Sequence, residues 1–269
     1  MKILTLNLHC FAEENIEENQ QTIVDAILKE DIDVILLQEV AQPRTNKIVY
    51  DDVKEDNYGY VLKHKLENSG VNYYYHYQFG NQAFGLYDEG LGILSKTKLT
   101  DESHFYISKT IDYNNWSTRI IVSAMTLIEG QDIVFTSAHL GWSDGTEVFE
   151  DQVDVLMSNL KDSYINIIGG DYNISPGTKE YKHIINKGFI DLFFNNQDEY
   201  YNTPTHVKNI DGKDGSSRID FVMSNTEFEV INRKILFDIN KVSDHYGVLI
   251  EIKRWEQWNT ENLKKIIVI

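Results

Sequence analysis

Two short polar stretches decide which fold this chain is expected to adopt: Gly169-Gly170-Asp171-Tyr172-Asn173 and, nearer the C-terminus, Ser243-Asp244-His245. The first follows the apolar run 164–168, and the second precedes the apolar run 247–250. Such runs are typical of buried strands, whose end residues are held rigidly and still reach solvent. Carboxylate and amide oxygens there suit a hard cation such as Mg²⁺, and a neighbouring histidine suits proton transfer. The pattern indicates metal-assisted hydrolysis of a phosphate ester.

The same arrangement recurs along the chain, because other strand-like runs carry a polar residue at or near one end. These residues are Asn7, Gln38-Glu39, His139 and Asp220. One such residue alone is explained by hydrogen bonds to buried backbone groups. Together with Asp171 they make five such strand ends, which this does not explain, because neighbouring carboxylates repel one another unless a cation holds them.

Seven short motifs, in this order, resemble the endonuclease/exonuclease/phosphatase superfamily, the group with the DNase I-like fold. They are Leu6-Asn7, Leu37-Gln38-Glu39-Val40, Asp88-Glu89-Gly90, Ser137-Ala138-His139-Leu140, Gly169-Gly170-Asp171-Tyr172-Asn173, Arg218-Ile219-Asp220-Phe221 and Ser243-Asp244-His245. Each motif alone is weak, but together they cover nearly the whole chain. Within the superfamily, His139-Leu140-Gly141-Trp142, followed by Asp144 and Phe149-Glu150-Asp151-Gln152, is similar to bacterial sugar-phosphate phosphatases of the maltose 6'-phosphate type.

The resemblance implies an α/β fold, a four-layer α/β/β/α sandwich of two stacked, mostly antiparallel sheets. It also assigns roles to individual residues. The expected metal ligands are Glu39, Asn7, Asp244 and Asp171, with Mg²⁺ as the ion and Mn²⁺ as a substitute. The expected catalytic residues are His245, His139, Asp171, Asn173, Asp220 and Glu89. By the same resemblance, Glu89 orients His245 and Asp220 orients His139, so that one imidazole activates water and the other stabilises charge or protonates the leaving oxygen.

Residues for substrate binding are inferred from chemistry and position. Arg119 is expected to clamp a phosphate with two hydrogen bonds, and an inter-sheet or surface ion pair is its alternative. Trp142, three residues after His139, is expected to stack on a sugar ring, with Asp144 bound to its hydroxyls. Trp116, Phe84 and the tyrosines at 73–75 are candidates for the same wall, although most aromatic residues belong to the core. Five other histidines are interpreted as structural: His64, His76, His104, His183 and His206.

The composition of the chain limits its possible partners and its cellular compartment. The net charge is −17, with 42 acidic and 25 basic residues, which disfavours nucleic acid as a partner. The single cysteine, Cys10, excludes an intrachain disulfide and fits a reducing compartment, where it is expected to be inert. Residues 1–8 form too short an apolar segment for a signal peptide, and no run approaches the ~20 residues of a membrane span. We therefore expect one cytoplasmic catalytic domain over residues 1–269.

The spacing of apolar residues along the chain predicts the approximate positions of helices and strands. Helices are predicted over 15–30 and 146–161, and a strand, a loop and a short helix over 164–187. A tyrosine-rich hairpin is predicted over 59–79, with its turn at 68–70. Strands are predicted over 2–8, 33–38, 91–95, 103–109, 118–128, 132–139, 218–223, 228–237 and 246–253.

The expected function is a metal-dependent phosphomonoesterase that acts on a small sugar phosphate. The first alternative is an endonuclease or exonuclease with the same catalytic centre. A basic groove in the structure would favour this alternative. The second is a sphingomyelinase-type phosphodiesterase, weakened by the absence of an apolar surface loop. A non-catalytic binding module on the same fold is expected to lack one or more of the catalytic motif residues. This alternative is disfavoured, because the chain retains all six of them: Asn7, Glu39, Asp171, Asn173, Asp220 and His245.

Overall fold

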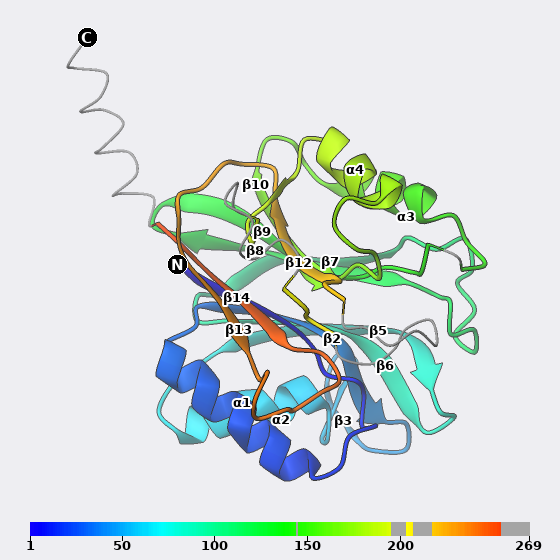
Figure 1. Ribbon diagram of the computed structural model, residues 1–269. Helices are drawn as coiled ribbons and strands as arrows, with labels where there is room; N and C mark the ends of the chain where they lie inside the picture. Colours follow the sequence, from blue (N-terminus) through cyan, green and yellow to red (C-terminus); the bar gives the residue numbers. More distant parts are fainter. Residues whose placement is uncertain (144, 195–202, 207–216, 254–269) are drawn as a thin grey trace, which may run out of the picture.

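The computed structural model describes residues 1–143, 145–194, 203–206 and 217–253 (Figure 1). The helices are α1 (Ile16–Glu30), α2 (Tyr58–Asn68), α3 (Phe149–Asn159) and α4 (Lys179–Asn186). The strands are β1 (Lys2–Asn7), β2 (Val34–Pro43), β3 (Ile48–Tyr50), β4 (Val53–Lys54), β5 (Tyr74–Ala83), β6 (Tyr87–Ser95), β7 (Leu99–Tyr106), β8 (Ile120–Ile128), β9 (Gln131–His139), β10 (Ile165–Asp171), β11 (Ile190–Asp191), β12 (Asp220–Ser224), β13 (Val230–Leu236) and β14 (Gly247–Ile252).

Two six-stranded sheets lie face to face, and helices cover their outer sides. The first sheet has the order β13-β14-β1-β2-β6-β5, and the second has the order β11-β12-β10-β9-β8-β7. Helices α1 and α2 lie below the first sheet in Figure 1, and α3 and α4 lie above the second. The predicted four-layer sandwich is therefore confirmed. In the described part of the chain, no helix combines the length and apolarity needed to cross a bilayer.

The two sheets are built alike. Each has one parallel pair at its centre, β1 with β2 and β9 with β10, and antiparallel pairs around it. In the first pair Asn7 lies opposite Gln38, and in the second Asp171 lies opposite His139. The carboxyl ends of parallel strands meet at one edge of a sheet, so each sheet presents a pair of polar side chains there. The two halves of the chain therefore resemble each other in how their central strands pair.

Alternation along the strands divides the apolar residues among three core layers. In β1, Leu4 packs beneath the helices of the first sheet, whereas Ile3 packs between the sheets. In β10, Ile167 packs between the sheets and Ile168 packs beneath α3 and α4. These strands are buried on both faces, which explains why they read as continuous apolar runs.

Residues 59–68 form a helix, so the prediction of a hairpin over 59–79 is wrong. The side chain of Asn57 caps α2 by accepting from the Tyr60 amide at 3.0 Å. Tyr58, Leu62 and Leu66 then follow at four-residue spacing on the buried face. The expected turn is the end of this helix, where Gly70 has a φ of 87°. The period of four and the cap outweigh the strand preference of the tyrosines, and only 74–83 forms a strand.

Most other predicted elements lie within a few residues of their expected positions. Strands β3, β4 and β11 fall outside every predicted range because they are only two or three residues long. Asp144, which the sequence analysis placed beside a sugar, and the C-terminal segment from Trp255 to Ile269 both lie outside the described residues.

Candidate active site

A pocket of about 290 Å³ opens where the carboxyl ends of the two parallel pairs meet. Both sheets contribute to its walls. The predicted site residues that line it are Glu39, Glu89, Arg119, His139, Trp142, Asp171, Asn173, Asp244 and His245. The sequence motifs, although far apart along the chain, therefore converge on one cavity.

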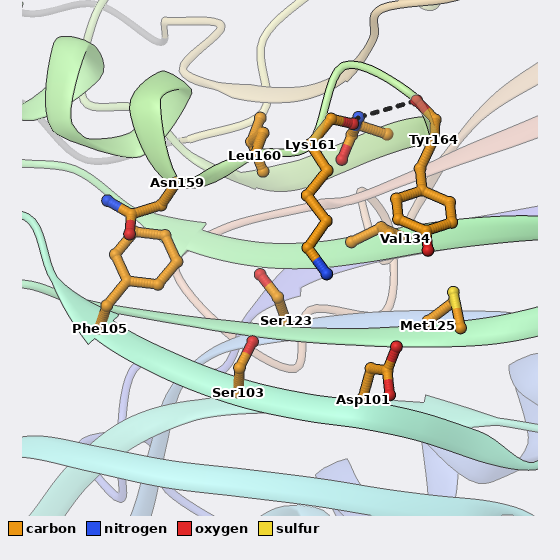
Figure 2. Close-up of a pocket in the computed structure, with 11 residues that line it drawn as sticks. Asp101, Ser103, Phe105, Ser123, Met125, Val134, Asn159, Leu160, Lys161 and Tyr164 are labelled. Atoms are coloured by element: carbon orange, nitrogen blue, oxygen red, sulfur yellow. Dashed lines mark hydrogen bonds between the residues drawn. The ribbon is translucent and has the colours of Figure 1, made fainter.

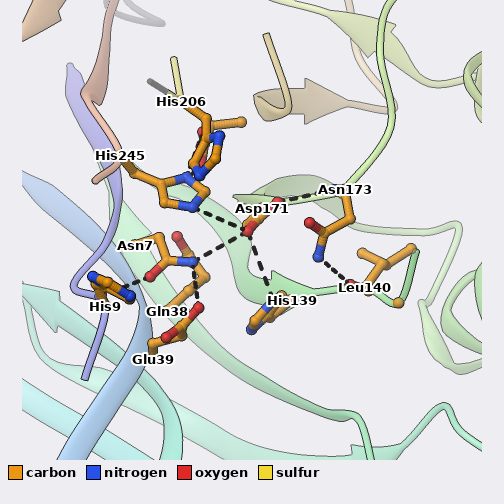
Figure 3. Close-up of polar contacts among 12 residues, drawn as sticks. Asn7, His9, Gln38, Glu39, His139, Leu140, Asp171, Asn173, His206 and His245 are labelled. Atoms are coloured by element: carbon orange, nitrogen blue, oxygen red, sulfur yellow. Dashed lines mark hydrogen bonds and ion pairs between the residues drawn. The ribbon is translucent and has the colours of Figure 1, made fainter. Parts of the chain in front are cut away.

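Asn7 joins the two sheets beneath this pocket (Figure 3). Its amide nitrogen donates to Glu39 Oε1 at 3.0 Å and to Asp171 Oδ2 at 3.1 Å. Its amide oxygen accepts from the backbone N–H of His9 at 2.9 Å, which fixes the orientation of the amide. In this arrangement Asn7 is a donor that holds two carboxylates together, rather than an oxygen turned to a cation.

Glu39 reaches the pocket because strand β2 bulges at this point. Leu37 pairs with Gly92 and Val40 pairs with Gly90, so Gln38 and Glu39 together oppose a single residue. Glu39 has a φ of 48°, a left-handed conformation that is costly for a residue with a side chain. The bulge re-aims the Glu39 side chain toward the second sheet. Sequence alternation alone does not predict it.

Gln38 faces the second sheet and is fully buried. Its amide nitrogen donates to Ser137 Oγ at 2.9 Å, and Ser137 Oγ donates to the Leu37 carbonyl at 2.8 Å. Thr5 Oγ1 also donates to Gln38 Oε1 at 3.2 Å. The two bonds with Ser137 cross the interface between the sheets one residue before the site and fix how the two strand ends meet.

The loop after β10 fixes the Asp171 side chain through Asn173. The backbone N–H of Asn173, whose φ is 53°, donates to Asp171 Oδ1 at 2.9 Å. The Asn173 side chain donates to the Leu140 carbonyl at 2.8 Å, and its oxygen is buried without a partner among the described residues. Gly170 is required before Asp171, because a Cβ there would lie 1.9 Å from the Ala138 carbonyl oxygen.

His245 is paired with Asp220, not with Glu89 as predicted. Its Nδ1 lies 3.0 Å from Asp220 Oδ2, and its Nε2 faces Asp171 Oδ2 at 3.6 Å. Burial alone would lower the pKa of His245, but the carboxylates of Asp220 and Asp171 raise it to about 10. The imidazole is therefore a cation at neutral pH in this arrangement.

Thr205 holds the backbone at the start of β12, from which the Asp220 side chain extends. Its Oγ1 accepts from the backbone amides of Ile219 and Asp220 at 3.0 and 3.1 Å, and its carbonyl accepts from the Tyr246 amide. Thr205 is fully buried. Thr205 thus links the start of β12, through its side chain, to the segment that carries His245, through its backbone carbonyl.

His139 lies beside Asp171 rather than Asp220, so its predicted partner is also wrong. The strand order β12-β10-β9 places Asp171 directly opposite His139 and Asp220 one strand farther away. His139 Nε2 lies 3.6 Å from Asp171 Oδ2. Burial, the Arg119 guanidinium and the His245 imidazole lower the pKa of His139 well below its usual range. It is therefore a neutral imidazole facing a cationic one.

Glu89 lies on the opposite side of the pocket, near Glu39 and Cys10. Burial, followed by the Glu39 charge, raises the pKa of Glu89 to about 7, and Asn81 donates to it at 3.4 Å. Burial and the charges of Glu89 and Glu39 raise the pKa of the Cys10 thiol well above its usual value. This environment supports the prediction that Cys10 is inert.

Arg119 is buried beside the pocket without a carboxylate partner. Its guanidinium donates to the backbone carbonyls of Trp116 at 2.7 Å and Thr118 at 3.3 Å. Its Nε has no partner in the described part of the chain, and the partners of its guanidinium there are backbone carbonyls rather than carboxylates. The alternative of an ion pair is thus not seen, and the guanidinium faces a cavity that an anion can enter.

Two histidines complete the wall beside Asp244, and neither was expected there. His9 Nδ1 lies 2.6 Å from Glu13 and 3.3 Å from Asp244 Oδ1. His206, interpreted from sequence as structural, has its Nε2 3.7 Å from Asp244 Oδ2, and its ring centroid lies 4.5 Å from that of His245. His9 follows Asn7 by two residues, which is the one sequence signal that identifies it. No such signal marks His206.

Aromatic side chains from three separate loops form the rim. Phe84 is 68% exposed and Trp116 is 61% exposed, and both line the pocket together with Trp142. Large apolar side chains that remain exposed around a polar cavity are typical of ligand contacts. Tyr73 and Tyr75, by contrast, pack in the core beneath the first sheet.

The residues present fit a divalent cation. Burial raises the pKa of Asp171 to about 7, and the nearby Asp220 and Glu39 charges also act to raise it, while the His245 imidazole opposes them. The carboxylates that lie close together around the pocket are Asp171 with Asp220, Glu39 with Glu89, and Glu13 with Asp244. The unpaired oxygen of Asn173 adds a neutral donor. A hard cation that prefers oxygen ligands is consistent with this set.

The family model described as the Endonuclease/Exonuclease/phosphatase family matches residues 4–245. The chain belongs to this family. Its members are metal-dependent phosphoric ester hydrolases, so the chain is assigned the same general chemistry. No curated protein sequence matches the chain.

Some of the solved structures that resemble this chain are described by what they act on or bind. An endonuclease/exonuclease/phosphatase family protein from Leptotrichia buccalis is 32% identical, with a TM-score of 0.85 over 94% of this chain and 99% of that one. A mannosyl-6-phosphatase from Bacteroides thetaiotaomicron is 14% identical, with a TM-score of 0.65 over 94% and 99%. TDP2 from D. rerio, complexed with a single-strand DNA product, is 14% identical, with a TM-score of 0.67 over 94% and 98%. The last two show the fold alone.

Proposed function

We propose that the protein is a phosphomonoesterase that hydrolyses a small sugar phosphate. The observation that carries this proposal is the shape and lining of the pocket. Its volume of about 290 Å³ is bounded by Phe84, Trp116 and Trp142, and acids and imidazoles line the rest of it. Its one permanent cation among the described lining residues is Arg119. A cavity of this kind accommodates a terminal phosphate and one or two sugar rings.

The phosphate is proposed to bind beside Arg119, with its ester oxygen toward His245. Mg²⁺ or Mn²⁺, held by Glu39 and Asp171 with Asp244 nearby, would neutralise phosphate charge and polarise the phosphorus when bound. Cationic His245, fixed by Asp220, stabilises developing negative charge or donates a proton to the leaving oxygen. Neutral His139 and Asp171 are placed to accept the proton of an attacking water.

The leaving group is proposed to lie against the aromatic rim. Trp142 offers the flat apolar face on which a sugar ring packs, and its neighbour Asp144 stays a proposed partner for the hydroxyls. The mannosyl-6-phosphatase from Bacteroides thetaiotaomicron supports a sugar phosphate as the substrate class, because it shares the fold.

A nuclease activity is the second candidate, supported by the fold shared with TDP2, whose structure holds a DNA product. The net charge of −17 and the acids around the pocket oppose it, because flanking phosphates would meet carboxylates without counterions. The decisive experiment compares kcat/KM for maltose 6'-phosphate and for a short DNA duplex in Mg²⁺. Cleavage of the duplex without release of inorganic phosphate from the sugar would overturn the proposal.

A further inference from the structure

A second recess lies on the outer face of the second sheet, away from the active-site pocket. It has a volume of about 80 Å³, and among its lining residues are Ser103, Phe105, Ser123, Met125, Lys161 and Tyr164 (Figure 2). This volume corresponds to roughly five or more ordered waters, which is larger than an incidental packing gap. None of these residues contributes to the site described above.

The recess exists because helices α3 and α4 cover only part of this face. Ile121 on β8 and Ala138 on β9 pack beneath them. Farther along the same strands, at even spacing and therefore on the same face, lie Ser123 and Val134. The segment from 160 to 164, between α3 and β10, stands beside these residues as a wall. The uncovered floor carries hydroxyl groups, so it is not built to receive a further apolar helix.

Asn166 places a fixed acceptor at the edge of the recess. Its amide nitrogen donates to the carbonyls of Lys161 at 3.0 Å and Tyr164 at 2.9 Å. Carbonyl groups only accept hydrogen bonds, so the amide atom that faces these two carbonyls must be the nitrogen of Asn166. The other amide atom is therefore its oxygen. Asn166 is 1% exposed, and its oxygen has no partner in the part of the chain that the structure describes. A buried amide oxygen without a donor indicates a ligand group or an ordered water.

The charges around the recess balance. Lys161 extends across it, with its ammonium 5.6 Å from the centre of the Tyr164 ring, and Asp101 faces upward from the opposite strand (Figure 2). No ion pair joins the two side chains within 4 Å. A ligand that carries net charge would therefore meet one group of its own sign. A ligand with both donors and acceptors but no net charge satisfies Asp101, Lys161 and the Ser103 hydroxyl together, whereas the Ser123 hydroxyl already bonds Thr136 Oγ1 at 2.9 Å.

We propose that this recess binds an uncharged sugar ring. Phe105 and Tyr164 supply apolar ring faces at its two ends, as Figure 2 shows, and the carboxylate, ammonium, amide and hydroxyl groups between them match a set of sugar hydroxyls. The proposal does not rest on the substrate of the active site. Asn166 precedes Asp171 by five residues on β10, a separation of about 17 Å along a strand. Binding and hydrolysis are thus separable measurements.

The test is a titration of the full chain with D-glucose and with maltose, followed by amide NMR spectra. We expect saturable shifts for residues 101–105, 123–125 and 159–166, with dissociation constants on the order of millimolar. Asp101→Asn and Lys161→Met should each weaken this binding at least about tenfold, since 1.4 kcal/mol corresponds to a factor of ten. Asp132→Asn, an exposed carboxylate elsewhere on β9, is the matched control and should leave binding unchanged.

The comparison ligands decide the chemical class. Benzoate and choline carry one charge each and should produce weaker shifts in the same residues than glucose does. Equal or stronger binding of either ion would overturn the assignment to a sugar, and so would the absence of saturable shifts with both sugars. Hydrolysis by Asp101→Asn should equal that of the original chain, so failure of the recess proposal and failure of the proposed phosphatase activity give different results.

Discussion

The amide nitrogen of Asn7, at the end of a strand in the first sheet, donates to Asp171 Oδ2, in the second sheet, at 3.1 Å. The same nitrogen donates to Glu39, so one amide holds a carboxylate from each sheet. The floor of the active-site pocket is therefore set by the packing of sheet on sheet. A change that shifts the sheets relative to one another will alter the site even when it touches no catalytic residue.

The first prediction concerns the metal. Removal of divalent cations with EDTA should abolish hydrolysis, and Mg²⁺ or Mn²⁺ should restore it. Glu39→Gln keeps the size of the side chain but removes its charge, so we expect at least ~100-fold lower kcat, about 2.7 kcal/mol of transition-state stabilisation. Calorimetric titration with Mg²⁺ should show weaker binding by the variant. Full turnover by the chelated protein would exclude the metal-dependent mechanism.

The second prediction tests the pairing of histidines with acids. His245→Ala and His139→Ala should each lower kcat strongly while the fold is retained. Because Asp220 acts through His245, Asp220→Asn combined with His245→Ala should cost little more than either change alone. Combined with His139→Ala, the same Asp220→Asn change should add its full effect. The reverse pattern of coupling would support the pairing inferred from sequence and contradict the observed one.

The third prediction assigns a positioning role to Thr205. Thr205→Val preserves shape but leaves the amides of Ile219 and Asp220 without their acceptor, at a cost of about 1–3 kcal/mol for each unsatisfied group. We expect lower kcat with little change in KM, and reduced stability in urea. Thr205→Ser retains the oxygen and should recover most of kcat. If serine is no better than valine, packing rather than the hydroxyl is responsible.

The fourth prediction concerns the aromatic rim. Trp142→Ala should mainly raise KM for a sugar phosphate, because stacking contributes alike to the substrate and the transition state. Initial rates with maltose 6'-phosphate and with inorganic pyrophosphate separate the two effects, since only the former has a ring to stack. Tyr74→Ala removes an exposed aromatic that does not line the pocket and serves as the control. A drop in kcat at unchanged KM would contradict this role.

The fifth prediction concerns stability. Gly170→Ala would place a Cβ 1.9 Å from the Ala138 carbonyl oxygen, so the paired strands β9 and β10 must separate. Overpacking of a rigid backbone costs about 1–3 kcal/mol or more, and the urea midpoint should fall accordingly. Gly130→Ala offers a comparison in open space, although its φ of 80° adds some strain there too. A Gly170→Ala variant as stable as the original chain would show that the strands adjust freely.

Local sequence patterns predicted much of the fold. Strand ends near Asn7, His139 and Asp171 are marked by apolar runs that stop at a polar residue, and these side chains do converge. The partner of each histidine was not predictable, because it depends on which strands are neighbours in the sheet. Strand β10 lies between β12 and β9, so Asp171 is the carboxylate next to His139. Asp220, on β12, lies next to His245 instead.

Two other differences have physical causes of the same kind. The bulge turns Glu39 into the pocket because β2 has one more residue than its partner β6 at this point. The sequence of β2 alone does not show this difference. The tyrosine-rich segment after Asn57 was predicted as a hairpin because tyrosine favours strands, yet its buried residues recur every four positions. Tertiary packing on the first sheet selects the helix.

The position of β1 has a consequence for synthesis of the chain. This first strand is completed on one side by β2 and on the other by β14, where Lys2 pairs with Glu251 and Thr5 with Val248. On the ribosome, β1 therefore has an unpaired edge until β14 emerges, and such edges invite aggregation. His245 arrives with that same final strand. The nascent polypeptide thus gains His245 and the second neighbour of β1 together, so chains released before β14 should be both inactive and prone to associate.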